Sequence, residues 1–255
     1  MIYLKDKPED RGQPERLFWH GREGPTGMVI FRDRREAGKR LAKELEHYRG
    51  EKLLVLALPR GGVPVGAEIA RRLAAPLDVV VARKIGAPGQ PELAIGAVAQ
   101  IGESGTPATV LNRDILRVLG LADGMVARLR QAQLQEVVQR AARFRAGLPP
   151  LAVDGRTVIL VDDGIATGAT VEAAIAALRP LAPRRIVVAV PVAPRDTLER
   201  LRGEADAVVC LSEPHDFLAI GAFYADFDQV EDAEVVRLLA ESRAAPPEGA
   251  AAKGD

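Results

Sequence analysis

The sequence has one cysteine, no net charge and no long hydrophobic run. The single Cys210 cannot form a disulfide within the chain, which is typical of a reducing compartment, so we expect a cytoplasmic protein. Lysine plus arginine number 35, as do aspartate plus glutamate, so no overall field draws the chain to nucleic acid. No stretch approaches the roughly 20 apolar residues that cross a bilayer, and the polar N-terminus lacks the apolar region of a signal peptide. We therefore expect neither nucleic acid nor a membrane as a partner.

Two common nucleotide-binding motifs are also absent. The sequence contains no G-x-x-x-x-G-K-[ST] loop and no G-x-G-x-x-G fingerprint, and it shows no repeat of the solenoid type. Any phosphate site in this chain must therefore use a different loop.

The chain does contain short apolar runs that alternate with helical patterns. Its 255 residues, 47% of them hydrophobic, are enough to bury a sizeable core. Near-continuous apolar strands separated by helices indicate a parallel sheet covered on both faces. We therefore predict a doubly wound, mostly parallel α/β fold. Its expected strands are LLVLAL from Leu53, LDVVVA from Leu77, TVILV from Thr157, RIVVAV from Arg185 and AVVCL from Ala207.

The composition also suggests where the folded body begins and ends. Residues 1–27 mix proline, glycine and charge without periodicity, and residues 243–255 are low in complexity, so we expect a mobile arm and a disordered tail around a domain at 28–242. Within it, residues 85–150 hold a Gly- and Pro-rich stretch, with the possible strands LAIGAVAQI and ATVLN, and then a long polar helix. We interpret this insertion as a mobile flap followed by a helical excursion; a plain hairpin with a surface helix is the alternative.

The most informative segment is VILVDDGIATGAT, residues 158–170. A buried strand fixes where its turn begins, small residues let successive backbone N–H groups converge, and the following helix adds the positive end of its dipole. Charge-assisted hydrogen bonds of about 1.5–3 kcal/mol each can then hold a phosphate dianion without a lysine. The expected phosphate-binding residues are Ala166, Thr167, Gly168, Ala169 and Thr170.

Two carboxylates, Asp162 and Asp163, stand side by side at the end of this strand. Adjacent buried carboxylates repel and lose hydration, which is costly unless something cationic or rich in hydroxyl groups binds there. Vicinal ribose hydroxyls or a hydrated Mg²⁺ would compensate. A lone acidic pair is more often a strand end that caps the next helix, but the full segment favours a ribose phosphate site.

VILVDDGIATGAT resembles the signature of type I phosphoribosyltransferases. The resemblance implies that Asp162 and Asp163 are catalytic and face the ribose of 5-phosphoribosyl 1-pyrophosphate (PRPP), which arrives with Mg²⁺. It further implies an enzyme of nucleotide salvage, expected to be a homodimer, that transfers the phosphoribosyl group to a nitrogen nucleophile such as a nucleobase and releases pyrophosphate. A PRPP-binding regulator without catalysis and a phosphoribosyl-compound hydrolase are the alternatives.

The pyrophosphate side is expected at the carboxyl end of the first strand, where open α/β sheets bind ligands. Residues 59–62, PRGG, resemble the pyrophosphate loop of the family, in which a non-prolyl cis peptide is common. The second strand ends in Arg83 and Lys84, which we expect to act as catalytic cations on the leaving pyrophosphate; a solvated strand end is the alternative. The expected pyrophosphate-binding residues are Arg60, Gly61 and Gly62.

The segment 211–228 resembles the hood of the hypoxanthine–guanine branch of the family. By that resemblance Phe217 stacks on the base, and Asp226 approaches either the metal, together with Asp163, or the pyrophosphate. One position departs from the pattern, because oxopurine members have an aspartate where this chain has Ala166. That difference resembles adenine- or uracil-type members, so the acceptor base stays open.

Overall fold

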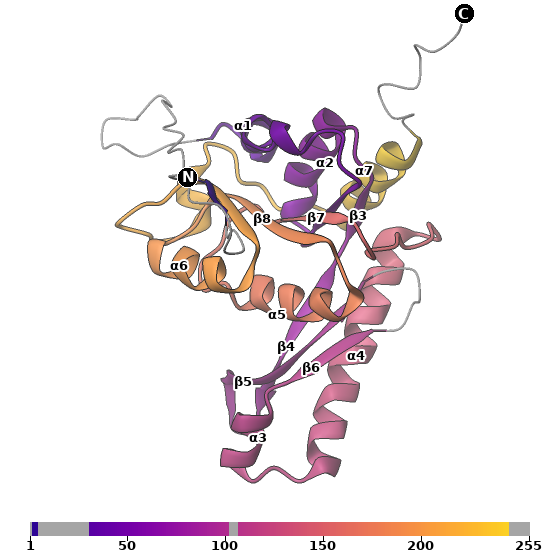
Figure 1. Cartoon of the computed structure of the whole chain (residues 1–255), viewed down its shortest axis with the longest axis vertical. Coiled ribbons are helices and arrows are strands. Elements are labelled where there is room, and N and C mark those ends of the chain that lie inside the picture. Colours follow the sequence, from indigo (N-terminus) through magenta and orange to yellow (C-terminus); the bar gives the residue numbers. More distant parts are fainter. Residues whose placement is uncertain (1, 5–30, 102–106, 245–255) are drawn as a thin grey trace, which may run out of the picture.

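The computed structural model of the protein describes residues 2–4, 31–101 and 107–244 (Figure 1). Its main sheet has six strands in the order β1-β9-β8-β7-β2-β3. All neighbours pair in parallel except β1, which is antiparallel to β9. The predicted mostly parallel α/β fold is therefore confirmed. The strands are β1 (Ile2–Leu4), β2 (Leu53–Ala57), β3 (Leu77–Val79), β7 (Thr157–Val161), β8 (Arg185–Val192) and β9 (Ala207–Ser212).

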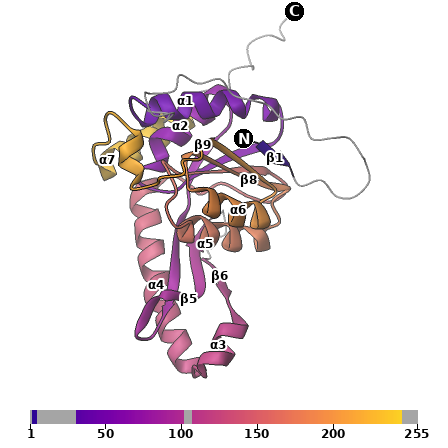
Figure 2. The ribbon, with the colours of Figure 1, turned by 90° about the vertical axis from the view of Figure 1, so that its left-hand side faces the viewer.

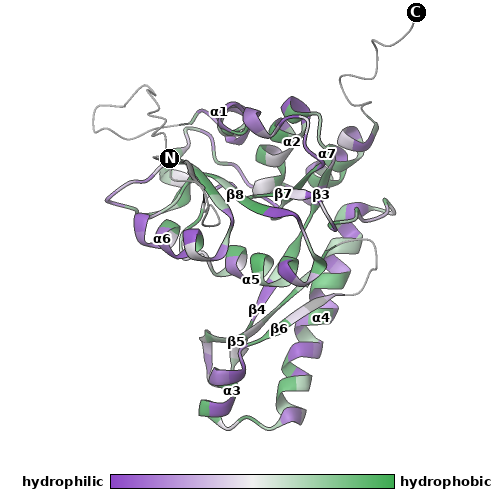
Figure 3. Ribbon diagram, in the orientation of Figure 1, coloured by the Kyte–Doolittle hydropathy of each residue, from purple (hydrophilic) through white to green (hydrophobic). Residues whose placement is uncertain are grey.

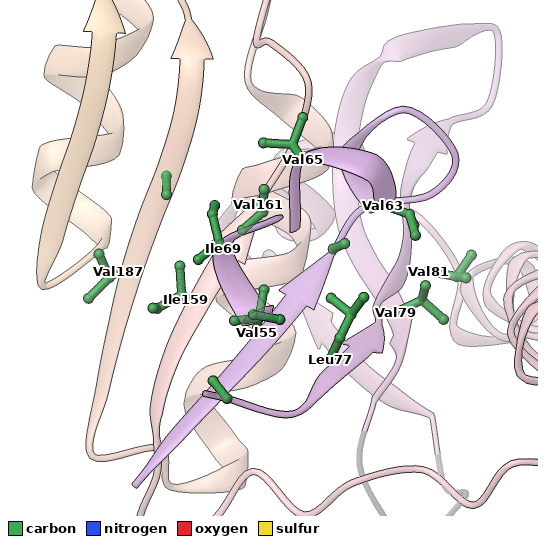
Figure 4. Packing of buried hydrophobic residues seen from close by; sticks show 14 of the residues in the cluster. Val55, Val63, Val65, Ile69, Leu77, Val79, Val81, Ile159, Val161 and Val187 are labelled. Atoms are coloured by element: carbon green, nitrogen blue, oxygen red, sulfur yellow. The ribbon is translucent and has the colours of Figure 1, made fainter. Parts of the chain in front are cut away.

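The apolar strands form the middle of the core because both of their faces are covered. Val55, Ile159 and Val187 are register partners on three adjacent strands, and they pack in one cluster with Ile69 (Figure 4). Alternate residues of the same strands, such as Leu160, belong to a second cluster on the opposite face. Strands buried in this way require continuous apolar runs instead of alternation.

Helices form a layer on each face of the main sheet (Figures 1 and 2). Three lie on one face: α1 (Arg34–Glu44), α2 (Gly62–Leu73) and α7 (Asp232–Ala244). Two lie on the other: α5 (Ala169–Leu178) and α6 (Arg195–Glu204). Figure 3 shows mainly hydrophobic residues along the sheet between these layers. Short 3-10 helices are η1 (Glu46–Tyr48), η2 (Arg179–Leu181) and η3 (Ile220–Phe223).

The insertion expected after the second strand folds as a second, antiparallel sheet in the order β4-β5-β6. Ile95 and Val98 pack in the cluster that holds Phe144 of α4, whereas Ala97 and Ala99 pack in the cluster that holds α5. The insertion is thus tied to the helix that follows the candidate phosphate turn. Its elements are β4 (Val81–Ala87), β5 (Gln90–Gln100), β6 (Ala108–Leu111), α3 (Arg113–Leu119) and α4 (Asp123–Arg145).

Three boundaries differ from the sequence prediction. The run LDVVVA is divided, because only Leu77–Val79 joins the main sheet and Val81 already begins β4. Residues 2–4, expected in a mobile arm, pair with β9; three residues are too few to show a periodicity. Arg243, expected in the disordered tail, lies in α7 and donates a hydrogen bond from Nε to the carbonyl of Leu77 at 3.2 Å. Residues 1, 5–27 and 245–255 of the expected arm and tail lie outside the described residues.

The strand order also determines where a ligand can bind. The chain leaves β2 toward β3 on one side, and β7 pairs with β2 on the other. Such a reversal leaves a crevice at the carboxyl ends of the two strands, which is the usual ligand site of open α/β sheets. Among the described helices, none is both long and apolar enough to span a bilayer.

Candidate functional site

The loops that follow β2 and β7 lie directly against each other at this edge. A Cβ atom placed on Gly61 would be 1.9 Å from Oδ2 of Asp163, and one on Gly62 would be 2.7 Å from the carbonyl oxygen of Val161. The peptide between Pro59 and Arg60 is cis. The structure therefore brings together the two loops that the sequence singled out, and it does so only because both positions are glycine.

The acidic pair has a cationic partner that sequence reasoning missed. Nε of Arg34 lies 2.7 Å from Oδ2 of Asp163, and each of these side chains is only 12% exposed. The same guanidinium donates from Nη1 to the carbonyl of Asp228 at 2.7 Å and lies 3.8 Å from the ring centroid of Phe227. The side chain of Asp163 is therefore held in place beside a fixed positive charge.

Asp162 has a different electrostatic environment from its neighbour. Burial raises the pKa of the Asp162 carboxyl well above its ordinary value, and the charge of Asp163 raises it further. Oδ1 of Asp162 accepts a hydrogen bond from the backbone N–H of Asp163 at 2.9 Å. A cation or a hydroxyl group bound here would stabilise the ionised form of Asp162.

The phosphate turn is held from behind by α6. The Thr197 hydroxyl donates to the carbonyl of Ala166 at 2.9 Å, and Arg200 donates to the carbonyl of Thr167 at 2.7 Å. Because C=O and N–H point in opposite directions across a trans peptide, these contacts direct the N–H groups of Thr167 and Gly168 away from α6. Gly168 has φ +81° and is the N-cap of α5. The first backbone N–H groups of α5, which have no partner within the helix, therefore lie at the end of the same turn.

The remaining predicted residues of the turn follow from this arrangement. Ala169 is the first residue of α5, and the side chain of Thr170 is exposed at its first turn. The structure thus gathers all five predicted phosphate-binding positions in one strand-to-helix connection.

The hood is joined to the same strand end. Phe31 forms a parallel β-bridge with Tyr224, and the Tyr224 hydroxyl donates to the carbonyl of Asp163 at 2.6 Å. A Cβ atom on Gly164 would lie 2.5 Å from Cγ2 of Ile220, so glycine is also needed where η3 packs on the turn. These contacts fix the hood over the acidic pair.

Two hood residues expected in the site make local contacts. Phe217 is half-buried and stacks on Phe223, with ring centroids 5.7 Å apart. Asp226 is exposed, and its carboxylate accepts a hydrogen bond from the amide of Asp228 at 3.3 Å. In the described part of the chain, no three His, Cys, Asp or Glu side chains gather as a metal site, so Asp163 and Asp226 do not belong to an all-protein metal cage there.

We expected Arg83 and Lys84 at the end of a strand of the main sheet, and the structure does not place them there. Both lie inside β4, opposite Val98 and Ala97 of β5, because the apolar run continues past the main sheet into the second one. Arg83 forms an ion pair with Glu136 of α4. The structure therefore places these two cations in the insertion.

Arg60 lies in the loop that packs on the acidic pair and also contacts α7. Its Nη1 is 3.6 Å from Oδ1 of Asp232, whose other oxygen is 3.3 Å from Nη1 of Arg143 in α4. Arg60 is thus paired with an acidic side chain of α7.

No local motif marked the additional site residues. Arg34 lies 129 positions from Asp163 and stands beside Arg35 without any distinguishing pattern. Thr197 and Arg200 occupy an ordinary amphipathic helix. Tyr224 lies within the hood segment, and that resemblance was the signal that could have found it.

The fold, the reversal of strand order and the paired loops define a type I phosphoribosyltransferase-like protein. Residues 33–228 match the family model of the phosphoribosyl transferase domain. The chain belongs to this family.

Similar proteins support the assignment. The crystal structure of TT1426 from Thermus thermophilus is 48% identical, with a TM-score of 0.74 and coverage of 84% of this chain and 99% of that one. Two Mycobacterium tuberculosis proteins, from strains CDC 1551 and H37Rv, are named as candidate phosphoribosyl transferases and are 47% identical over 212 residues. That alignment covers 83% of this chain and 47% of each relative, so the chain spans about half the length of these relatives.

Proposed function

We propose that this protein transfers the 5-phosphoribosyl group of PRPP to a nitrogen nucleophile, a nucleobase in the simplest case, and releases pyrophosphate. The observation that carries the proposal is the approach of Gly61 to Asp163, with 1.9 Å between a Cβ position and Oδ2. It brings the loop that carries Gly61 next to the acidic pair, which leads directly into the candidate phosphate turn. PRPP has a matching order of groups: a 5-phosphate, a diol and a pyrophosphate.

The donor would bind with its ends in opposite loops. The 5-phosphate would accept hydrogen bonds from the N–H groups of Thr167, Gly168 and the first turn of α5, which the contacts from α6 leave directed toward it. The ribose hydroxyls would donate to the acidic pair. The pyrophosphate would lie at Gly61 and Gly62, where the loop approaches the pair with backbone alone.

The described residues fit Mg²⁺ as a companion of the donor. Mg²⁺ usually keeps several waters and takes one or two carboxylates together with substrate phosphates, without a dedicated protein cage. Asp162 has the matching chemistry, because burial raises the pKa of this carboxyl and a cation would stabilise its ionised form. Asp163 and Asp226 are the further candidates. When bound, the ion would supply positive charge to the departing pyrophosphate.

The transfer itself breaks the bond between the anomeric carbon and pyrophosphate and forms one to the acceptor nitrogen. Arg60 would exchange Asp232, now 3.6 Å away, for the leaving group and stabilise its growing charge. Arg83 and Lys84 would join it if the insertion closes toward the site, which would also exclude water and suppress hydrolysis. Phe217, in its aromatic cluster, would stack on an acceptor base.

Pyrophosphate release measured with PRPP and Mg²⁺ tests the proposal. We expect no release without acceptor and rapid release with at least one of adenine, hypoxanthine, guanine, xanthine and uracil. Pyrophosphate release at the same rate with and without an acceptor would identify a hydrolase. Donor binding without release would identify a regulator, and no change in melting temperature at millimolar PRPP would exclude all three.

A further inference from the structure

Arg34 lies at the point where three parts of the site meet. It is the first residue of α1, after the N-cap Asp33. Its guanidinium binds the carboxylate of Asp163 and the carbonyl of Asp228, both at 2.7 Å. One planar group therefore connects the end of β7 to the hood.

The surroundings of this guanidinium set it apart from the exposed ion pairs of the chain. Both partners are 12% exposed, whereas exposed pairs contribute little because water screens them. The ring of Phe227 covers one face of Arg34 at 3.8 Å. Planar stacking combined with two directed donors is a geometry that arginine provides and lysine does not.

The carboxylate that Arg34 holds also lies against the loop that carries Gly61. Oδ2 of Asp163 is 2.7 Å from Nε of Arg34 and 1.9 Å from the position that a Cβ atom on Gly61 would take. If this carboxylate rotates, it must press on the loop that carries Gly61 or leave its partner. A displacement of Arg34 would therefore disturb both candidate anion-binding loops, the one that follows β7 and the one that carries Gly61.

We propose that Arg34 is a positioning residue of the donor site, which fixes the Asp163 carboxylate and sets the hood over it so that acidic pair and hood act as one unit. The consequence for turnover rests on the proposed function. The consequence for the hood does not, because it concerns the protein without ligand.

The hood has other attachments, which make the proposal testable in a folded protein. The Tyr224 hydroxyl binds the carbonyl of Asp163 at 2.6 Å, and backbone hydrogen bonds join residues 31–32 to residues 223–226. None of these contacts involves the Arg34 guanidinium. Removing the guanidinium therefore leaves most of the hood attached and releases only its contact at Asp228.

The experiment compares Arg34→Gln and Arg34→Lys with Arg35→Gln. Arg35 is the next residue of the same helix, and its guanidinium is about half-exposed, 4.0 Å from Glu234. Hydrogen–deuterium exchange of the amides at 217–228 reports the hood. Steady-state kinetics with PRPP and an active acceptor report the donor site.

We expect Arg34→Gln to speed exchange at the Asp228 end of the hood and to raise the KM for PRPP about tenfold with little change in kcat, because misplacement of a binding group weakens donor binding. Arg34→Lys should restore the wild-type melting temperature, because lysine restores the positive charge. It should not restore the slow exchange or the KM, because lysine lacks the planar, two-donor geometry of the guanidinium. Arg35→Gln should match wild type in every measurement.

Wild-type hood exchange in Arg34→Gln would overturn the proposal. Full recovery by Arg34→Lys would also overturn it, since charge compensation alone would then explain the residue. If the wild-type protein neither binds PRPP nor releases pyrophosphate, the proposed function fails, and hood exchange still decides whether Arg34 couples the two parts.

Discussion

Gly61 and Asp163 lie so close that no side chain fits between them, because a Cβ atom on Gly61 would be 1.9 Å from Oδ2 of Asp163. The backbone of Gly61 has φ −61° and ψ −35°, which any residue adopts. Glycine is needed here for space and not for backbone freedom.

Gly61→Ala should therefore abolish PRPP binding, because the methyl group must displace either the loop or the carboxylate. The measurement is the rise in melting temperature on adding PRPP with Mg²⁺. Gly203→Ala is the control, since that helical glycine has nothing within 4 Å of its Cβ position; it should bind normally and gain about 0.4–1 kcal/mol of unfolding free energy. Equal donor binding by both variants would place the site elsewhere.

The two aspartates should respond in opposite ways to loss of charge. Asp163→Asn leaves the guanidinium of Arg34 without its anion and should lower the free energy of unfolding by roughly 3 kcal/mol. Asp162→Asn removes the less compensated charge and should raise the melting temperature of the unliganded protein at neutral pH. Urea denaturation of both variants checks this, and a similar loss in both would show that the pair is structural as a unit.

The effect of Asp162 should depend on pH in a defined direction. Its pKa is raised in the folded protein, so the folded state binds the proton more tightly and wild-type stability falls as pH rises from about 4. Asp162→Asn lacks this loss, and its advantage in melting temperature should widen with increasing pH. An advantage that is constant across pH would show that Asp162 does not titrate in this way.

The hydroxyl of Thr197 should matter for the phosphate turn. Thr197→Val removes the hydrogen bond to the carbonyl of Ala166 and should weaken binding of ribose 5-phosphate more than that of pyrophosphate. Thr157→Val is a matched control, because Thr157 is equally buried and its hydroxyl binds Glu51 at the opposite end of β7. Both variants should lose about 1 kcal/mol of stability, but only Thr197→Val should lose affinity, as measured by calorimetry.

A buried ion pair away from the site should affect the stability of the protein and not its ligand binding. Nε of Arg145 lies 2.9 Å from Oδ1 of Asp78, with exposures of 7% and 1%. Asp78→Ala should cost about 3–5 kcal/mol of unfolding free energy, because it leaves a buried charge unpaired. Asp114→Ala, from an exposed pair with Arg117, should change stability by less than about 1 kcal/mol; equal losses in urea denaturation would contradict the distinction.

The sequence predicted every strand of the main sheet except the three-residue β1, because a strand buried on both faces needs an uninterrupted apolar run. It failed for Arg83 and Lys84, since the run LDVVVA crosses from one sheet into another without any change in composition. Which sheet a strand joins depends on its partners, and β4 pairs with β5 instead of with a strand of the main sheet.

The sequence by itself determined the candidate phosphate turn and the acidic pair, because each depends on neighbouring residues: a strand end, small residues and a helix start. Only the tertiary structure decided that Arg34, Tyr224 and Thr197 serve them, through contacts across 129, 61 and 31 positions. Such contacts arise when whole helices and loops pack on the sheet, and the residues around each partner carry no trace of the one it will meet.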